Sequence, residues 1–544
     1  MTVDARFAHE RMLDRGAARA QPSLWSETSS RGMVVTAHYL ATRAGVQMLE
    51  AGGNAVDAAV AAALALGVCE SAGSGLGGMA MLLVYDAPRE RVRGLPGACR
   101  APALATPEVV SRSSRYRGHS AVAVPTQLAV LRTALTRYGR LSQREVIAPA
   151  IVLAEEGLPL TPLQSRLIGQ YAGALRRGPL ARLFLDEAGA PYAPGSLFRQ
   201  LALAATLKRL ARDGFEDFYQ GAIAREISAD MEAHGGFVRA ADLAAAAEPR
   251  EREPILGGFG DDQVATLGPP AGGLTLLQML HLLDATPAVP RPSDPTWSVL
   301  LARIIRCARR DRQRYRLRTG AEDPGEAAEL LDRQHARSVA RRLARGLGGP
   351  GETSHVCTMD AAGNAVSLTQ SIERSFGAGA ASDALGFLYN GYLRAFKVQN
   401  RRHPHYLVPG APARSNAAPT LCLHQGRVRV VLGSTGSERM NSGILQVLAR
   451  LAHQSPFEAS HAPRLHCTPE GVVLLEAERF SEAARSALVA AGLRLEPLEA
   501  YSFKMGGLQL IVSDDTGLVG VTEPRRDGAA AGPRESAPAN EPTP

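Results

Sequence analysis

The stretch GETSHVCTMD, residues 351–360, decides the fold of this chain, because it places a threonine between a glycine-rich segment and a hydrophobic strand. A threonine hydroxyl is a poor nucleophile unless a base lies beside it. Cleavage of the preceding peptide bond frees the threonine's own α-amine for that role. Here that bond joins Glu352 and Thr353. The simpler alternative is that Thr353 only begins a strand after a loop, and the rest of the sequence separates the two interpretations.

Short glycine-rich and alanine-rich strings lie in a fixed order on both sides of Thr353. They cover residues 31–34, 51–61, 74–78, 154–157, 217–221, 269–274, 360–367, 376–377 and 524–532, with Thr353-Ser354-His355 in the same series. In this order the strings resemble the γ-glutamyltranspeptidase family of N-terminal nucleophile hydrolases. The resemblance runs over nearly the whole chain, and agreement at so many ordered places argues against chance.

The resemblance implies an α+β fold, a four-layer αββα sandwich of the N-terminal nucleophile hydrolase type. It also implies a precursor that cuts itself into a large subunit, residues 1–352, and a small subunit, residues 353–544, which stay associated. The family uses no cofactor, and none is expected here. Residues 341–351 (RRLARGLGGPG) are the best candidate for a linker. A disordered tail is expected from about residue 528.

Hydrophobic periodicity predicts helices early in the chain and strands late in it, which suits the sandwich. The expected helices cover residues 41–50, 54–68, 141–157, 201–213 and 274–283. The expected strands cover residues 356–359, 365–369, 428–432 and 508–512. The second helix is rich in alanine, which favours close packing inside a large core.

Charge and cysteine content narrow the class of protein further. The net charge of +8 comes almost entirely from arginine, since the lysines are Lys208, Lys397 and Lys504. This favours biased amino-acid usage over a nucleic-acid-binding surface. The densest basic run, residues 303–318, is expected to form a solvated helix face. The six cysteines are scattered without a C-x-x-C pair and are expected to be buried free thiols.

Targeting signals are not found in the sequence. Residues 1–30 carry charges throughout and lack the apolar core of roughly 7–15 residues that a secretory signal needs. A run of about 20 apolar residues, as a membrane span requires, does not occur either. The expectation is a cytoplasmic protein without membrane contact.

The resemblance assigns the catalytic steps to particular residues. Thr353 Oγ would attack the carbonyl of Glu352 during processing and a substrate amide afterwards, giving an acyl-enzyme that water or an acceptor amine resolves. Ser371 occupies the position of a second hydroxyl that touches the nucleophile. Gly436 and Ser437 fall where the family has a glycine pair whose backbone N–H groups form the oxyanion hole. Ser437 replaces the second glycine, and such pairs often adopt positive φ.

Residues that bind the acyl donor follow from the same resemblance. Arg100 is expected to hold a carboxylate of the donor in a forked contact, and Glu373 to receive its amino group. Tyr392, Ser415 and Asn416 are expected to line the same site. The substrate is expected to be a small carboxylated amide or a γ-glutamyl-like molecule.

The donor site departs from the family in residues 390–396, NGYLRAF. Relatives hold the substrate's ammonium with an aspartate where this chain has Ala395, and the second of their paired serines is here Asn416. Arg394 and Arg414 lie nearby in sequence. The loss of an anionic contact beside two arginines favours a donor with more negative charge, or one without a free ammonium.

Three functions remain open at this point. The first is a self-processing, Thr-dependent γ-glutamyltransferase-like amide hydrolase or acyltransferase, similar to glutathione hydrolases, with an altered donor. The second is cleavage of a carbon–carbon bond in a carboxylated substrate, as in family members from natural-product pathways. The third is a non-enzymatic scaffold or binding protein, although such a descendant has no reason to keep Thr353, Ser371 and Gly436 together. A metal site is not expected, because His403 and His405 flank a proline too closely for two ligands of ordinary spacing.

Overall fold

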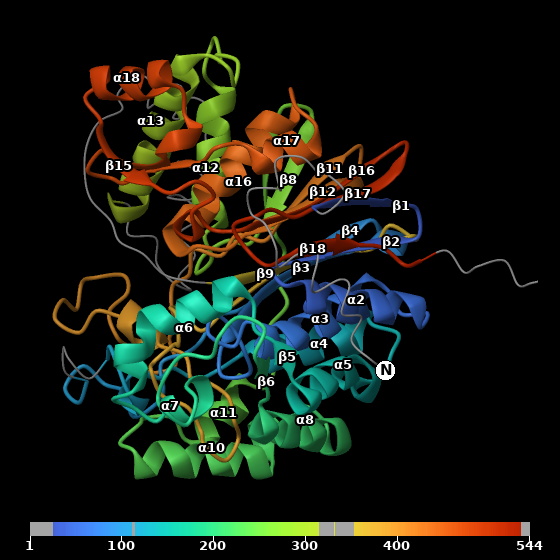
Figure 1. Cartoon of the computed structure of the whole chain (residues 1–544), viewed down its shortest axis with the longest axis vertical. Coiled ribbons are helices and arrows are strands. Elements are labelled where there is room, and N and C mark those ends of the chain that lie inside the picture. The colour runs from blue at the N-terminus through green and yellow to red at the C-terminus, as the bar shows by residue number, and fades with distance from the viewer. Residues whose placement is uncertain (1–24, 111–114, 315–330, 332–352, 535–544) are drawn as a thin grey trace, which may run out of the picture.

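The computed structural model describes residues 25–110, 115–314, 331 and 353–534, and this part of the chain forms four layers (Figure 1). Two antiparallel sheets face each other in the middle, and helices cover the outer face of each. The expected α+β, four-layer αββα sandwich is therefore confirmed. Among the described residues, no helix is long and apolar enough to cross a membrane.

The first sheet carries the strand that begins after Thr353. Its six strands lie in the order β18 (Ala529–Ala531), β2 (Gly32–Thr36), β9 (Ser354–Asp360), β10 (Ala365–Ser371), β3 (Met79–Asp86) and β4 (Arg91–Gly97). Its outer face packs against α2 (Tyr39–Glu50), α3 (Ala55–Cys69) and α4 (Gln127–Tyr138), with α5 (Gln143–Glu156) and α8 (Leu201–Asp213) behind them. Further helices of this layer are α6 (Pro162–Leu175), α7 (Ala181–Phe184), α9 (Asp217–Gln220), α10 (Ala222–Ala233) and α11 (Ala240–Ala246).

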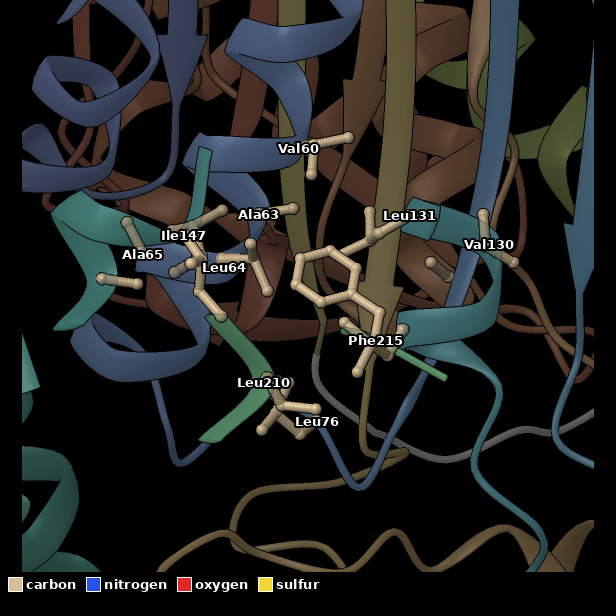
Figure 2. Close-up of a cluster of buried hydrophobic side chains, with 14 of the residues drawn as sticks. Val60, Ala63, Leu64, Ala65, Leu76, Val130, Leu131, Ile147, Leu210 and Phe215 are labelled. Carbon is tan, nitrogen blue, oxygen red and sulfur yellow. The ribbon is translucent and has the colours of Figure 1, made fainter. Parts of the chain in front are cut away.

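Helix α3 is the centre of this layer, and nearly all of its residues are buried. Its alanines let neighbouring elements approach closely, and Figure 2 shows leucine, valine and phenylalanine side chains of the surrounding elements packed around it. The helix begins with a capping box between Asn54 and Asp57. Asp360, the last residue of β9, accepts a hydrogen bond from Ala55 N at 3.1 Å. The start of α3 is thereby fixed to the strand that follows Thr353.

The second sheet has seven strands and its own helical cover. The strand order is β1 (Ser26–Ser29), β17 (Gly517–Val521), β16 (Leu508–Asp514), β12 (Arg427–Ser434), β11 (Thr420–His424), β8 (Asp262–Thr266) and β7 (Ile255–Phe259). The covering helices are α12 (Gly273–Asp284), α13 (Pro295–Arg314), α16 (Met440–Leu451), α17 (Pro456–His461) and α18 (Glu482–Ala490). A small sheet of β13 (Leu465–Cys467), β14 (Val472–Glu476) and β15 (Arg494–Leu498) lies beside them, and β5 (Leu158–Pro159) pairs with β6 (Leu197–Phe198) in the other helical layer.

The two sheets pack closely at one point, where Gly433 of β12 lies against the ring of His355 of β9. A β-carbon at position 433 would lie 2.0 Å from His355 Cε1, far closer than non-bonded carbon atoms approach in real proteins. Apolar side chains from both sheets, among them Met81, Val431 and Ile511, fill the rest of the interface. Glycine at 433 therefore sets how closely the sheets approach beside the start of β9.

The expected helices and strands are all present, with small changes at their ends. The helix expected over 141–157 begins later, at Gln143, because Ser142 caps it through Glu145. The tail expected from about residue 528 is wrong at its start, since residues 529–531 form β18 and pair with β2. Their small side chains are mostly buried against the sheet edge. The proposed linker, residues 341–351, and Glu352 lie outside the described residues.

Replacing Gly433 by alanine is expected to force the sheets apart or displace His355. We expect Gly433→Ala to lower the free energy of unfolding by about 1–3 kcal/mol, as overpacking of a well-packed interior does. The measurement is urea unfolding followed by circular dichroism. Gly173→Ala is the matched control, because position 173 lies in α6 with no atom within 4 Å of the added carbon. Equal stability of the two variants would contradict the close approach.

Candidate active site

Thr353 lies directly before β9 and is buried, with 7% of its surface exposed. Strands β9 and β10 are antiparallel, and Ser354 pairs with Gln370. This register brings the last residue of β10, Ser371, opposite Thr353. The Oγ atoms of the two residues are 3.5 Å apart. The two hydroxyls that the sequence singled out are thus neighbours through strand pairing alone.

Ser371 is held in place by its own neighbours. Its Oγ accepts a hydrogen bond from the backbone N–H of Glu373 at 2.8 Å. The Tyr392 hydroxyl hydrogen-bonds with both Ser371 and Ser415, and burial raises the pKa of this phenol. The structure therefore gathers Thr353, Ser371, Glu373, Tyr392 and Ser415 into one group.

Glu373 adopts an unusual backbone conformation, with φ of +89°. Non-glycine residues in this region carry strain of about 1–3 kcal/mol, and such residues concentrate at functional sites. Burial raises the pKa of the Glu373 carboxyl, and Arg394, the nearest of the surrounding arginines, opposes that shift. Arg394 Nη1 lies 3.4 Å from Glu373 Oε2. The carboxylate is therefore already paired with a cation.

Four arginines, Arg309, Arg312, Arg394 and Arg414, surround this group, and we call them the arginine cluster. Burial lowers the pKa of Arg312 to about 9, with Arg414 and Arg309 adding repulsion. Arg312 Nη2 donates to the Ser415 carbonyl at 2.8 Å, and Arg309 Nη2 lies 2.6 Å from Glu438 Oε2. Burial also lowers the pKa of Arg414. Positive charges this close, with few carboxylates between them, repel one another, and a bound anion would relieve that repulsion.

Two members of the cluster correct an expectation from the sequence. The basic run 303–318 was expected to form a solvated face, but Arg309 is only 5% exposed and Arg312 reaches Ser415. Arg306, one turn earlier on α13, is buried as well and donates to the Pro469 carbonyl. The three residues lie three positions apart, so they share one stripe of the helix. That stripe faces the protein rather than the solvent.

Gly436 and Ser437 both have left-handed backbones, with φ of +100° and +56°. A β-carbon at Gly436 would lie 2.6 Å from Gly506 Cα, so only glycine fits there. Ser437 therefore adopts a conformation that favours glycine, at a cost typical of a strained residue. The pair follows the end of β12, where Gly433 meets His355. Their backbone N–H groups consequently lie at the same end of the sandwich as Thr353.

Arg100 and Asn416 relate differently to this group. The backbone around Arg100 pairs with residues 410–413, which lead to Arg414, through Ala101 N to Ala411 O at 2.9 Å. The Arg100 side chain itself donates to the Gly410 carbonyl at 3.2 Å, and Arg250 and Arg252 are its charged neighbours. Its described contacts do not join it to Thr353. Asn416 follows Ser415, and its carbonyl packs against Gly272.

A cavity of about 50 Å³ beside Thr353 was not foreseen from the sequence. Apolar side chains from three segments line most of it: Leu160, Leu163, Leu167, Ile168, Phe184, Phe198 and Phe503. Glu70 and Ser354 form its polar end, where Ser354 Oγ donates to Glu70 Oε2 at 2.7 Å. In the sequence, the apolar face of α6 was the one feature that could have indicated this cavity. That face alone does not reveal which strand the helix covers. The nucleophile thus has an apolar space in contact with it.

Among the described residues, the candidates for a metal site are His119, Asp230 and His234. They come from η4 (His119–Ala121), from α10 and from the residue that caps α10, not from the elements that carry Thr353 and Ser371. The residues around Thr353 are hydroxyls, carboxylates and arginines.

The comparisons with known proteins agree with this geometry. The family model described as Gamma-glutamyltranspeptidase matches residues 41–533. The chain is 35% identical to the acylase ACY 1 proenzyme of Pseudomonas sp. (strain SE83), over 92% of this chain and 93% of that protein. It is 30% identical to the oxamate amidohydrolase proenzyme of Klebsiella pneumoniae, over 93% and 99%. The crystal structure of cephalosporin acylase from Bacillus halodurans superposes with a TM-score of 0.84 at 26% identity, covering 96% of this chain and 100% of that one.

His355, two residues after Thr353, makes folding sensitive to pH. Burial lowers its pKa from the ordinary value of 6.5 to about 3, so the imidazole is neutral in the folded protein. The unfolded chain takes up a proton below pH 6.5, and stability is therefore lost as the pH falls from 6.5 towards 3. The loss approaches about 1.4 kcal/mol per pH unit for one such group.

We expect His355→Gln to reduce the slope of the free energy of unfolding against pH by the contribution of one proton. This holds whatever the substitution does to stability at neutral pH. The measurement is the free energy of unfolding in urea at pH 7, 6, 5 and 4. His38 is a matched second site, since burial lowers its pKa to about 3 as well. His38→Gln should reduce this slope by the same amount, and the double variant should reduce it by twice that amount. Parallel slopes in all four proteins would show that these imidazoles do not stay neutral.

Proposed function

This chain belongs to the gamma-glutamyltranspeptidase family of N-terminal nucleophile hydrolases, and from that premise we propose that Thr353 first cuts its own chain and then attacks a carboxylated amide. The family consists of self-processing enzymes whose relatives are named as proenzymes. The non-enzymatic scaffold, one of the expectations from the sequence, is therefore wrong. The donor and the roles of single residues form the proposal.

In the processing step, Thr353 Oγ attacks the carbonyl carbon of Glu352. The acyl group moves from nitrogen to oxygen, which leaves an ester and a free α-amine on Thr353. Water then hydrolyses the ester and leaves a carboxylate on Glu352. The products are residues 1–352 and 353–544. The contact between Thr353 and Ser371, at 3.5 Å, supports this step, because it gives the hydroxyl a polar neighbour in a buried position.

In the substrate step, the free α-amine of Thr353 takes the proton of the hydroxyl as Oγ attacks the amide carbonyl. The N–H groups of Gly436 and Ser437 stabilise the oxyanion, and the amine product leaves with a proton. Water resolves the acyl ester and restores Thr353. Ser371 positions the nucleophile, and Tyr392 with the Glu373 N–H orients Ser371. The names of the relatives, acylase, glutathione hydrolase and oxamate amidohydrolase, support an amide-type bond as the target.

The arginine cluster is the observation that carries the donor assignment. Arg394 already pairs with Glu373, which leaves that carboxylate little capacity to hold a substrate ammonium. Arg312 and Arg414 add positive charge next to Ser415. A carboxylate supplies the negative charge that this surface lacks, and an arginine binds it in a forked geometry. The favoured donor is the amide of a dicarboxylic acid that has no α-ammonium.

Processing can be tested by substituting the nucleophile. Thr353→Ala should remain a single chain and be inactive, because the hydroxyl is needed for both steps. Thr353→Ser should still yield two fragments, since its hydroxyl has the same chemistry. Intact-mass analysis of purified protein decides the outcome. A wild type that stays one chain while turning over substrate, or a Thr353→Ala protein cut between residues 352 and 353, would disprove the mechanism.

The donor can be tested with two p-nitroanilides, of glutaric acid and of γ-linked glutamate, which differ only in the α-ammonium. We expect kcat/KM to be higher for the glutaryl compound by about 10–100-fold, because an unpaired ammonium in a buried site costs about 1–3 kcal/mol. Ala395→Asp should move the ratio back towards the glutamyl compound. Equal turnover of both compounds, unaffected by Ala395→Asp, would contradict the donor assignment.

The same assay separates the two arginines proposed to hold the carboxylate. Arg100 is the residue that the resemblance assigns, and Arg414 is the one nearest to Ser415. We expect Arg414→Ala to lose at least about 30-fold in kcat/KM, as when one partner of a charge pair is removed, and Arg100→Ala to lose less. Arg427→Ala, on an exposed part of β12, is the control. Product analysis in the same reactions distinguishes amide hydrolysis, which releases an amine, from carbon–carbon cleavage, which does not.

A further inference from the structure

His119, Asp230 and His234 form a compact group of potential metal ligands in the helical layer. One ligand atom from each residue lies within 4.8 Å of the others. Asp230 and His234 are one helical turn apart at the end of α10, and His119 approaches them from η4. His119 Nε2 is 3.4 Å from Asp230 Oδ2, and His234 Nδ1 is 3.1 Å from Asp230 Oδ1. Two donor atoms bound at about 2.1 Å to one tetrahedral zinc ion are about 3.4 Å apart.

The group also has the surroundings of a metal site. The side chain of His119 is only 10% exposed, and its buried Nε2 makes no hydrogen bond of normal geometry with the described residues. The Tyr389 hydroxyl donates to Asp230 Oδ2 at 2.7 Å. Such outer contacts orient ligating carboxylates in known sites. The side chain of His234 is 56% exposed, and its ring stacks on that of His119 with 4.5 Å between the centroids. Its Nδ1 also lies 2.9 Å from the Asp230 carbonyl oxygen, a contact that binding of an ion through this nitrogen would replace.

We propose that His119, Asp230 and His234 bind one divalent transition-metal ion, with Zn²⁺ as the best match. Two imidazoles and one carboxylate suit zinc, whereas calcium and magnesium prefer sites made of oxygen. At 3.4 Å from Asp230 Oδ2, the buried Nε2 of His119 lacks a hydrogen bond of normal geometry, and a bound ion would supply it with a close partner. The fourth position is open to solvent on the side of His234.

The ion would have a structural role. It joins the end of α10 to the loop at Gly118, whose N–H donates to Ala378 O. Through Tyr389 it reaches residues 377–390, the segment between Glu373 and Tyr392 of the candidate active site. The three ligands precede the proposed cut after residue 352, and Tyr389 follows it. Metal binding would therefore stiffen the contact between the two parts of the chain.

The test uses the full chain, first dialysed against a chelator and then titrated with ZnCl₂ in competition with a chromophoric chelator. We expect one zinc per chain and a higher Tm after loading. Asp230→Asn and His234→Ala should weaken binding at least 100-fold. Because His234 is 56% exposed, His234→Ala is expected to fold as the wild type does. Tyr389→Phe should weaken it by about 10–100-fold, as removal of an outer contact does.

His424→Ala is the matched control, because His424 also lies 3.1 Å from a carboxylate, that of Asp262, which Arg429 already occupies. It should bind zinc as the wild type does. The Co²⁺-loaded protein should show the visible absorption of a tetrahedral site, and His234→Ala should not. Absence of stoichiometric zinc binding would overturn the proposal. Wild-type affinity in both His234→Ala and Asp230→Asn, or loss of binding in His424→Ala, would overturn it equally.

Discussion

The pairing register between β9 and β10 is the constraint on which the candidate active site depends. Thr369 lies opposite His355 and Gln370 opposite Ser354, so Ser371 ends opposite Thr353. A slip of one residue would turn every side chain of β10 to the other face of the sheet. The register is fixed from both faces: His355 contacts Thr369 and Gly433 between the sheets, while Ser354 reaches Glu70 on the helical side. Packing that is remote from the chemistry thus determines which hydroxyl the nucleophile meets.

The sequence pointed to those residues of the candidate site that stand in local motifs, and their roles stay predictions. Thr353, Ser371 and Gly436 stand in short sequence motifs at the ends of β9, β10 and β12. The pairing and packing of these strands bring the three residues to one end of the sandwich. The prediction that the arginines of α13 face the solvent was wrong. Arginines at three-residue spacing give the same sequence pattern whether that side of the helix faces solvent or protein. Only the docking of α13 beside Ser415 decides between the two. Arg100 shows the converse: a motif can keep a residue while its side chain turns to a backbone carbonyl.

Other features depend on tertiary contacts that no window of sequence contains. Residues 529–531 are alanines beside a stretch of small and polar residues and were expected to belong to a disordered tail, yet β2 offers them an open sheet edge and they pair with it. The cavity beside Thr353 draws its lining from α6, from the segment of Phe184 and Phe198, and from Phe503. His119 is more than a hundred residues from Asp230 in sequence, so only the i, i+4 spacing of Asp230 and His234 could have hinted at a shared site. Ser437 has a left-handed backbone next to Gly436, which packs against Gly506 from a distant part of the chain.

The strand order of the two sheets has a consequence for the fate of the molecule after processing. In the six-stranded sheet, β2, β3 and β4 come from residues 1–352, whereas β18, β9 and β10 come from residues 353–544, and strands of the two sets pair at β18–β2, β2–β9 and β10–β3. In the seven-stranded sheet, β1 on one edge and β8 with β7 on the other enclose four strands from the later part of the chain. Separation of the fragments would require the backbone hydrogen bonds between paired strands to break in both sheets at once. The proposed cut before Thr353 would therefore leave two fragments that are interleaved rather than docked.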